Sequence, residues 1–405
     1  MLIGIDAHNL ERERTGVGRY LINLLQEWSR LNFQFPISNF QFILYFKDEI
    51  PADISKSDLF KYKLLNVRST AKFMNWDLWR AAKKDKLDIL FCPDYRAPIL
   101  YNGNVAVTLH DISYETHPEW FNWPSSVDKI LLKWASKYTA KKAKLIFTPT
   151  EFVRNEIIEH YKVSAEKIVV TPLGVDPVLY RPEKFDSPIY KTSATGEIKK
   201  KYGIKDKYIF YVGSIFSRRH LPEVIAAFEQ LCQRDTNSPH PIPPLEKGRD
   251  ISTDYQFLIG GKDYTGGQSV NKIVKTTNAK LGREAILRVD FIADNELKLL
   301  YGACAFFIWL SDYEGFGLPP LEAMSLGAPV ITTDGSSLRE VAGDAALLIT
   351  DNSDAKEIYR AMHKIGRDGA LREELIERGK EQAKKFSWKE CAEKTLGALV
   401  SVKSK

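Results

Sequence analysis

Cysteine is scarce in this sequence, and its few cysteines are isolated from one another. Four occur in 405 residues, and no Cys-x-x-Cys pair is present. This spacing argues against a zinc site and against a disulfide framework, and it fits a reducing compartment. Long apolar runs are missing as well. Nowhere do about 18 uncharged apolar residues follow one another, so we expect no transmembrane helix.

An excess of charge of one sign is also missing. The formal net charge is +6, which is small for a chain of this length. Such a balance suits anionic partners such as phosphate groups or acidic lipid, but it does not indicate nucleic acid, and we expect none. The segment Met1–Asp6 lacks the basic region of a signal peptide, so the expected location is the cytoplasm.

The sequence does have enough apolar residues for two domains. Hydrophobic residues make up 44% of the chain, and two domains of roughly 150–200 residues are the natural expectation. Short apolar runs alternate with longer helical patterns, which predicts parallel α/β sheets. The strands expected in the first half are Leu2–Asp6, Phe40–Phe46, Ile89–Cys92, Val105–Leu109 and Leu145–Pro149. Those expected in the second half are Tyr208–Val212, Phe257–Ile259, Phe306–Trp309, Val330–Thr332 and Ala346–Ile349.

A proline-rich stretch, residues 171–188, separates the two series of strands. We therefore expect two Rossmann-like domains, residues 1–185 and 186–385, with a cleft between them. Residues 234–254 carry four prolines and little apolar content, which predicts a disordered insertion in the second domain. The last segment, about residues 386–405, has the pattern of an amphipathic helix.

The strongest functional signal lies in residues 306–327. An apolar strand there is followed by a glycine-containing loop and then by a helix that two prolines open. This arrangement places Glu314 in the loop and Glu322 in the first turns of the helix. Gly315 and Gly317 let the backbone approach a ligand closely, and the amino end of a helix can hold a phosphate.

Two other turns follow expected strands. The turn that contains Gly16 does not complete the pattern G-x-G-x-x-G, because Leu21 occupies the place of the third glycine. This argues against an NAD-dependent oxidoreductase. The turn at Gly213 is followed by Arg218 and Arg219, and arginine can bind phosphate oxygens in pairs.

His110 comes at the end of the expected strand Val105–Leu109, with Asp111 beside it. The carboxyl ends of parallel strands are where α/β proteins build their sites. His110 is therefore a candidate site residue, and Asp111 is a candidate to orient it.

Together these segments resemble glycosyltransferase family 4. In the stretch EGFGLPPLEAM seven residues separate the two glutamates, which resembles the EX7E motif of the family, and the other motifs follow in family order over nearly the whole chain. The resemblance implies the GT-B fold, an α/β fold of two Rossmann-like domains. The first domain would be the acceptor side, the second would bind a nucleotide sugar, and the final helix would cross back to the first domain. It also implies a retaining hexosyltransferase.

The resemblance implies roles for single residues. Glu314 would contact hydroxyls of the donor sugar, Glu322 those of the ribose, and His110 the sugar near the reaction centre. Arg218 and Arg219 would neutralise the leaving diphosphate, a task that other glycosyltransferases give to a metal held by Asp-x-Asp, a motif absent from this sequence. We expect no metal and no cofactor besides the substrate. The other expected donor-binding residues are Gly16, Gly213, Phe291, Ile292, Gly315, Phe316, Gly317 and Leu318.

The donor and the acceptor are expected only by likeness. EGFGLPPLEAM resembles the mannosyltransferase branch, which favours GDP-mannose as donor and a saccharide or lipid-linked saccharide as acceptor in cell-surface polysaccharide synthesis. A UDP-glucose-type donor is an alternative. So are a GT-B nucleotide-sugar epimerase or hydrolase and a non-catalytic nucleotide-sugar-binding module. The complete set of glutamates and arginines argues against the last of these.

A basic stripe occupies residues 128–144. Lys129, Lys133, Lys137 and Lys141 recur there at four-residue spacing, after a loop with three aromatic residues (Trp120, Phe121 and Trp123). A basic helix beside an aromatic loop predicts a peripheral contact with an anionic membrane, on its inner face. The alternative is a solvated helix with a packed loop.

Overall fold

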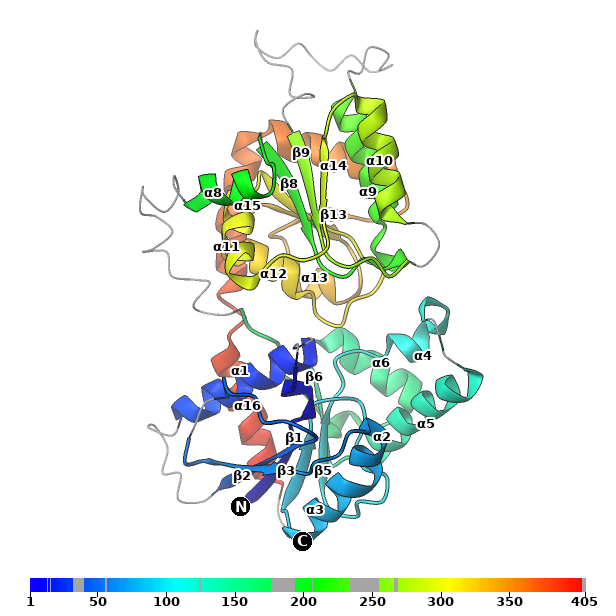
Figure 1. The fold of residues 1–405 in the computed structure, drawn as a ribbon, viewed down its shortest axis with the longest axis vertical. Helices are drawn as coiled ribbons and strands as arrows, with labels where there is room; N and C mark the ends of the chain where they lie inside the picture. The colour runs from blue at the N-terminus through cyan, green and yellow to red at the C-terminus, as the bar shows by residue number, and fades with distance from the viewer. Residues whose placement is uncertain are drawn as a thin grey trace. The chain divides into compact units, whose positions relative to one another are not determined.

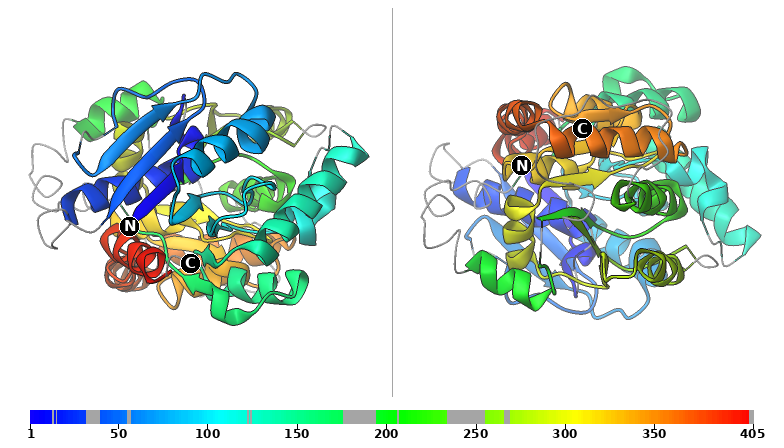
Figure 2. Two further views of the ribbon diagram at one scale, coloured as in Figure 1. Left: turned by 90° about the horizontal axis from the view of Figure 1, so that it is seen from below. Right: turned by 90° about the horizontal axis from the view of Figure 1, so that it is seen from above.

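The structure is a computed structural model that describes residues 1–12, 14, 16–31, 40–54, 57–121, 123, 125–175, 194–205, 207–233, 255–265 and 269–402. It divides into two compact units. Unit 1 comprises Met1–Gly174 and Phe386–Lys405, and unit 2 comprises Val175–Lys385. The domain boundary expected near residue 185 and the insertion expected at residues 234–254 lie outside the described residues. In each unit, helices cover both faces of a parallel sheet (Figures 1 and 2).

The sheet of unit 1 is parallel throughout, with the strand order β3-β2-β1-β4-β5-β6-β7. Its strands are β1 (Leu2–Asp6), β2 (Gln41–Phe46), β3 (Phe60–Leu64), β4 (Ile89–Cys92), β5 (Val105–Thr108), β6 (Leu145–Thr148) and β7 (Ile168–Val170). The central strands are buried on both faces, as their continuous apolar runs require. The order reverses beside β1, between β1 and β4, which is where open α/β sheets bind ligands.

The helical segments of unit 1 are η1 (His8–Leu10), α1 (Gly16–Leu31), α2 (Thr70–Lys72), η3 (Phe73–Asp77), α3 (Leu78–Lys84), α4 (Ser113–Thr116), η4 (Pro118–Trp120), α5 (Ser126–Lys142), α6 (Glu151–Tyr161), η5 (Ala165–Lys167) and α16 (Trp388–Ser401). One apolar core joins β2, β4 and β5 to α3 and α6. On the other face, Trp28 of α1 stacks on Phe42 of β2 at a ring distance of 5.1 Å. The sheet is thus buried between two helical layers.

The final helix belongs to unit 1. Ser387 caps α16 by accepting a hydrogen bond from the backbone N–H of Glu390. The indole N–H of Trp28 donates to the carbonyl oxygen of Ala392 at 2.9 Å, which ties α16 to α1. A Cβ on Gly174 would lie 2.1 Å from the backbone nitrogen of Trp388, so only glycine allows the chain to pass the start of α16.

The sheet of unit 2 is also parallel, with the order β10-β9-β8-β11-β12-β13. Its strands are β8 (Lys207–Val212), β9 (Tyr255–Gly260), β10 (Ile286–Val289), β11 (Phe306–Trp309), β12 (Val330–Thr333) and β13 (Leu347–Ile349). The helical segments of unit 2 are α8 (Thr195–Lys201), η7 (Ser217–Arg219), α9 (Leu221–Cys232), α10 (Val270–Leu281), α11 (Asp294–Ala303), α12 (Leu318–Ser325), α13 (Ser336–Ala342), α14 (Ala355–Arg367) and α15 (Gly369–Ala383). The strand order reverses between β8 and β11.

Three strands were missed from the sequence. β3, β7 and β10 each lie at the edge of a sheet. Their residues are only partly buried, as in β3, where a single residue of five is buried. Edge strands need no continuous apolar run, because one side faces solvent, and the apolar signal was therefore too weak to predict them.

Candidate active site

The loop after β8 begins at a position that demands glycine. Gly213 has a φ of +145°, and a Cβ there would lie 2.5 Å from the Trp309 ring. The chain then turns through η7 to His220, whose φ of +49° is followed by the start of α9. This turn carries Arg218 and Arg219 to the carboxyl edge of the sheet, at the point where the strand order reverses.

Arg219 is buried and paired with Glu314. Its Nε donates to Glu314 Oε1 at 3.1 Å, and its Nη2 lies 3.1 Å from the same oxygen. Its Nη1 donates to the carbonyl oxygen of Ser214. The guanidinium carbon lies 4.0 Å from the ring centre of Trp309 and 5.5 Å from that of Phe216. The cation is therefore held by a carboxylate, a carbonyl and two aromatic rings.

Arg219 stays charged although it is buried. Burial by itself lowers the pKa of Arg219, but the neighbouring Glu314 and Tyr211 raise it by more, and the net shift is upward. The guanidinium therefore stays charged and holds the Glu314 carboxylate in one place. A carboxylate fixed in this way can accept hydrogen bonds from the hydroxyl groups of a ligand.

Two serines of α13 anchor the backbone around Glu314. The Glu314 N–H donates to Ser336 Oγ at 3.3 Å. Ser337 Oγ donates to the carbonyl oxygen of Glu314 at 2.6 Å and to that of Phe316 at 2.9 Å. Phe316 is buried and Gly315 is half-buried, so packing and hydrogen bonds together fix this loop.

The helix α12 starts directly after this loop. Gly317 has a φ of +106° and precedes Leu318, the first helical residue. The first N–H groups of α12 have no partners within the helix, so its amino end presents donors and a partial positive charge. Glu322, in the second turn, accepts a hydrogen bond from the Tyr301 hydroxyl at 3.2 Å. The loop, the helix end and Glu322 thus follow one another along one segment.

Asp312, which was missed from the sequence, joins the loops after β8 and β11. Its N–H donates to the carbonyl oxygen of Arg218 at 2.9 Å, and its Oδ1 lies 2.7 Å from His220 Nε2. The hydrogen bond with Asp312 raises the pKa of His220. The Arg218 guanidinium lies 4.5 Å from the ring centre of Phe216. The signal that could have revealed Asp312 was an acidic residue just before Glu314 in the same loop.

The two residues expected beside the base of the donor differ in exposure. Phe291, just after β10, is 78% exposed, whereas Ile292 is buried. A Cβ on Gly260 would lie 2.5 Å from Ile292 Cδ1, so Ile292 packs against the end of β9. An exposed ring can stack on a planar ligand, while Ile292 supports the sheet.

In unit 1, His110 follows β5 and is held from two sides. Its Nε2 lies 3.2 Å from the carbonyl oxygen of Pro93, and its ring meets Tyr20 edge to face at 4.8 Å. Burial lowers the pKa of His110, so the neutral imidazole prevails at neutral pH. Asp111, the residue expected to orient it, accepts hydrogen bonds from Ser113 N–H and Oγ at 2.9 and 2.7 Å. Pro93 and Tyr20 therefore orient the ring.

Gly16 and Gly18 lie in the first turn of α1 and have different surroundings. Nothing lies within 4 Å of a Cβ placed on Gly16. A Cβ on Gly18 would lie 2.4 Å from the carbonyl oxygen of Asn9. Gly18 is therefore needed for packing against η1, whereas the side of Gly16 is open.

Sequence reasoning missed three polar residues at the same edge of this sheet: the buried Asp6 and Asp94, and the partly buried His8. Asp6 ends β1, and its Oδ1 lies 2.7 Å from His8 Nδ1. Burial lowers the pKa of His8, but the nearby acids, Asp6 foremost and then Asp94 and Glu11, together raise it by more, and the net shift is upward. Asp94, just after β4, accepts the Tyr95 N–H at 2.7 Å, and burial raises its pKa. An acidic residue at the end of an apolar run was the available signal in both cases.

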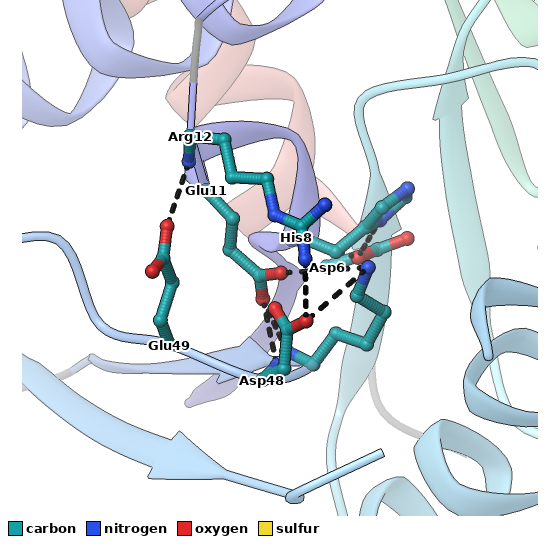
Figure 3. A network of polar contacts seen from close by, with 7 residues as sticks. Asp6, His8, Glu11, Arg12, Asp48 and Glu49 are labelled. Atoms are coloured by element: carbon teal, nitrogen blue, oxygen red, sulfur yellow. Dashed lines mark hydrogen bonds and ion pairs between the residues drawn. The ribbon is translucent and has the colours of Figure 1, made fainter. Parts of the chain in front are cut away.

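Figure 3 shows a second polar network, which joins the loops after β1 and β2. Glu11 Oε1 accepts the backbone N–H groups of Lys47 and Asp48, and Lys47 Nζ lies 3.7 Å from Glu11 Oε2. Arg12 donates to Asp48 Oδ2 at 3.2 Å. Burial raises the pKa of Glu11 to about 7. The network anchors the segment that leads into α1.

The described residues show neither a metal cluster nor a membrane-spanning helix. No group of three or more His, Cys, Asp and Glu side chains there is arranged to hold a metal ion. No helix in the same part of the chain is long and apolar enough to cross a membrane. The expected metal independence stays a prediction.

The chain matches two family profiles, one in each unit. Residues 14–179 match the profile described as Glycosyltransferase Family 4, and residues 195–382 match Glycosyl transferases group 1. Escherichia coli O-antigen chain mannosyltransferase B is 30% identical over 411 residues, which covers 95% of each chain. Salmonella typhimurium O-antigen chain mannosyltransferase RfbU is 25% identical over 255 residues, 62% of this chain and 58% of that protein.

Solved structures share the fold over the whole length of the chain. Anabaena HepE, in complex with UDP and glucose, superposes with a TM-score of 0.69 at 16% identity and covers 99% of both chains. WaaG, a glycosyltransferase involved in lipopolysaccharide biosynthesis, has a TM-score of 0.70 at 16% identity and covers 99% of this chain and 100% of its own. These likenesses confirm the expected GT-B fold. With the profile matches and the relative that spans 95% of both chains, they show that this chain belongs to glycosyltransferase family 4 and is a hexosyltransferase.

Proposed function

We propose that this glycosyltransferase takes mannose from GDP-mannose and transfers it to a saccharide or a lipid-linked saccharide in cell-surface polysaccharide synthesis. We further propose that it retains the anomeric configuration and needs no metal ion. The sugar and the acceptor class are inferred from relatives whose names describe O-antigen mannosyltransferases.

One observation carries the proposal: the buried pair of Arg219 and Glu314 at the point where the sheet of unit 2 reverses its strand order. A sugar presents neighbouring hydroxyl groups, and a carboxylate accepts hydrogen bonds from two of them. Because Arg219 already holds Glu314 in place, little order has to be imposed when the sugar arrives. We assign Glu314 to the hydroxyl groups of the donor sugar.

We assign the diphosphate of the donor to groups near Glu314. Most of the Arg219 donors face Glu314 and Ser214, so Arg218 is the principal diphosphate cation, assisted by Arg219. The backbone N–H groups from Gly315 to Leu318, at the amino end of α12, add a partial positive charge. Gly213 lets the chain pass close to the phosphates. These groups stabilise the charge that develops as the nucleoside diphosphate leaves.

We assign the nucleoside of the donor to Glu322 and to two residues just after β10, Phe291 and Ile292. Glu322, held by the Tyr301 hydroxyl, accepts hydrogen bonds from the ribose. The exposed ring of Phe291 stacks on the base, and the backbone at Ile292 lies next to it. From unit 1, we assign Gly16, in the first turn of α1, to the donor and His110 to the transferred sugar.

The neutral state of His110 has a chemical consequence. Because Nε2 faces the Pro93 carbonyl, it carries the proton of the neutral ring, and Nδ1 is left as an acceptor. The neutral ring can therefore accept a hydrogen bond from the sugar without placing a second positive charge near the anomeric carbon, where positive charge develops. Retention then needs no carboxylate nucleophile, since the leaving phosphate can take the proton of the acceptor hydroxyl as that hydroxyl attacks from the same face. The acceptor oxygen gains the sugar, and the diphosphate leaves with the proton.

The proposal is tested with the full chain and a panel of nucleotide sugars. GDP-mannose at 100 times its Kd should stabilise the protein by about 2.7 kcal/mol in a thermal unfolding assay. A mannose-terminated acceptor should then gain an α-linked mannose, detected by NMR, and the rate should be unchanged by EDTA.

Each alternative gives a different result. Exclusive use of UDP-glucose would replace the donor, and free sugar released at the same rate without acceptor would indicate a hydrolase. A changed sugar on the nucleotide would indicate an epimerase. A β-linked product would contradict retention. Loss of activity in EDTA that a divalent cation restores would contradict metal independence.

A further inference from the structure

The helix α5 turns a row of large apolar side chains toward solvent. Val127 is 71% exposed and Ile130 is 68% exposed. Leu131, Trp134 and Tyr138 are also exposed. We name these five residues the α5 stripe. Single exposed apolar residues are common on protein surfaces, but a contiguous row of them marks a surface that contacts something.

The stripe is a true helix face, because its spacing matches the helical repeat. Residues at positions i, i+3, i+4, i+7 and i+11 lie on one side of a helix. The residues of α5 that are buried, Ala135, Ser136, Thr139 and Ala140, are small and lie on the opposite side. The helix therefore packs on unit 1 through small residues and directs its large apolar ones outward. Figures 1 and 2 show α5 at the periphery of unit 1.

The charges on α5 are almost all of one sign. The helix carries five lysines and a single acidic residue, Asp128. From the helical repeat, Lys133, Lys137 and Lys141 lie along one side of the stripe and Lys142 along the other, whereas Lys129 lies farther round the helix, toward the buried side. Lys142 Nζ lies 5.7 Å from the ring centre of Tyr138. Lys133 pairs with Glu115 at 3.4 Å, and the Nζ groups of Lys137 and Lys142 donate to the carbonyl oxygens of His160 and Ile99 at 3.0 and 2.9 Å. The two carbonyls leave the charges of Lys137 and Lys142 in place, so the border of the stripe stays basic.

The loop before α5 and the exposed face of α5 hold their aromatic residues differently. Trp120 stacks on His117 at 3.9 Å, and the Trp123 indole donates to the carbonyl oxygen of Pro118 at 2.9 Å. These contacts fold the loop onto itself. Trp134 and Tyr138, in contrast, stack on each other at 5.3 Å on the exposed face of α5. Paired Trp and Tyr side chains, apolar with one polar end, suit the boundary between water and lipid.

We propose that α5 docks unit 1 onto an anionic lipid surface, with the α5 stripe directed into the acyl region and the bordering lysines at the phosphate level. Charge complementarity selects this occupant: an apolar ridge with lysines on both borders matches a surface that is apolar inside and negative at its rim. A second copy of this chain would bring its own five lysines against these. One ridge of five side chains is also small beside the roughly 800 Å² per partner of a stable protein interface.

The inference is independent of the donor and the acceptor. It adds a location for the reaction, because a lipid-linked acceptor would lie in the membrane to which unit 1 binds. Failure of the donor assay would leave the lipid assay unaffected, and the reverse also holds.

The test is co-sedimentation of the full chain with vesicles. We expect the protein to sediment with vesicles of 70% phosphatidylcholine and 30% phosphatidylglycerol at least tenfold more than with pure phosphatidylcholine. Ile130→Glu should reduce binding to the anionic vesicles at least tenfold, and Trp134→Ser at least threefold. The charge variant Lys137→Glu/Lys141→Glu should reduce binding at low salt and lose its effect at high salt, because salt screens charge but not apolar burial.

A matched control separates the stripe from general surface hydrophobicity. Trp76 in η3 is 47% exposed, against 49% for Trp134, and Trp76→Ser should leave vesicle binding unchanged. The melting temperatures of all variants should stay within a few degrees of the wild type, since the altered side chains face solvent.

Three results would overturn the proposal. The first is no sedimentation of the wild type with anionic vesicles at low salt. The second is an equal loss of binding in Trp76→Ser and Trp134→Ser. The third is a lipid-free protein that is a dimer by sedimentation equilibrium and becomes a monomer in Ile130→Glu, which would make the stripe a protein interface.

Discussion

The carboxyl edges of the two sheets share a topology but differ in chemistry. In unit 1, β1 and β4 end in buried acids, Asp6 and Asp94, with His8 and His110 nearby. In unit 2, the loops after β8 and β11 bring together the Arg219–Glu314 pair, beside the amino end of a helix. Both are topological switch points, where α/β folds bind ligands.

The difference shows how one architecture can present two kinds of chemistry. Unit 2 offers cations and helix donors, which suit a diphosphate. Unit 1 offers carboxylates and histidines, which suit hydroxyl groups and repel phosphate. The strand order creates the position of the site in each unit, and the loop residues decide what it holds.

The largest effect is expected from Glu314→Gln. Replacement of the carboxylate removes the acceptor for sugar hydroxyls and leaves Arg219 buried beside a neutral partner. We expect kcat/KM to fall by about 10²–10³-fold, in the range of losing one preorganised group at an active site. Glu340→Gln, an exposed residue of α13, is the control and should be silent. Turnover of Glu314→Gln within threefold of the wild type would falsify the assignment.

The next largest effect separates the two arginines. Arg219→Lys keeps the charge but loses the forked contact with Glu314, so kcat should fall by about 10²-fold while the Kd for the free nucleoside diphosphate changes little. Arg218→Gln should do the reverse and weaken nucleoside diphosphate binding by about tenfold or more. Isothermal titration and steady-state kinetics distinguish the two. Equal losses of diphosphate affinity in both variants would mean that Arg219 is simply a second phosphate ligand.

A pair of glycines tests the first turn of α1 in unit 1. Gly18→Ala forces a methyl group against the Asn9 carbonyl and should destabilise the protein by about 1–3 kcal/mol. Gly16→Ala has room for its methyl group and should leave the melting temperature unchanged or slightly higher. If the donor lies against Gly16, the same variant should raise KM for the donor by about tenfold. An unchanged KM would remove Gly16 from the donor site.

The smallest effect is expected in the dependence of stability on pH. His110 has a pKa below its ordinary value of 6.5, so the unfolded chain takes up the proton first and stability falls as pH drops through and below 6.5. His8 has a pKa above 6.5, so its stabilisation is complete below pH 6.5 and is lost as pH rises through the higher folded value.

Urea unfolding of His110→Asn and His8→Asn from pH 5 to 8 measures these slopes. Each unit of pKa shift corresponds to about 1.4 kcal/mol. The difference in the free energy of unfolding between the wild type and each variant, plotted against pH, should have slopes of opposite sign for the two variants. Slopes of the same sign would show that burial and ion pairing are not the opposing forces described for these two histidines.

Much of the fold could be predicted from the sequence, because buried strands carry their signal locally. Leu2–Asp6, Ile89–Cys92 and Phe306–Trp309 were predicted to the residue. The edge strands were missed, since their half-exposed residues show no continuous apolar run. Of the site, the motifs after strands were visible, but the acids at the ends of β1 and β4 were not recognised as neighbours.

The sequence by itself determined the kinds of groups available: a glycine turn with two arginines, a loop and helix with two glutamates, and a histidine at the end of a strand. It could do so because each motif is local, with its residues only a few positions apart. Only the tertiary structure decided that Arg219 holds Glu314, 95 positions away. The cause is the strand order, which places β8 next to β11 and so joins loops that the chain separates.

The same division holds for α5. Its helical repeat was plain from the sequence, but the periodicity of an apolar row is the same whether it faces a core or the solvent. The row faces solvent because the small residues on the opposite side of α5 are the ones that pack against unit 1, and this packing is a property of the tertiary structure.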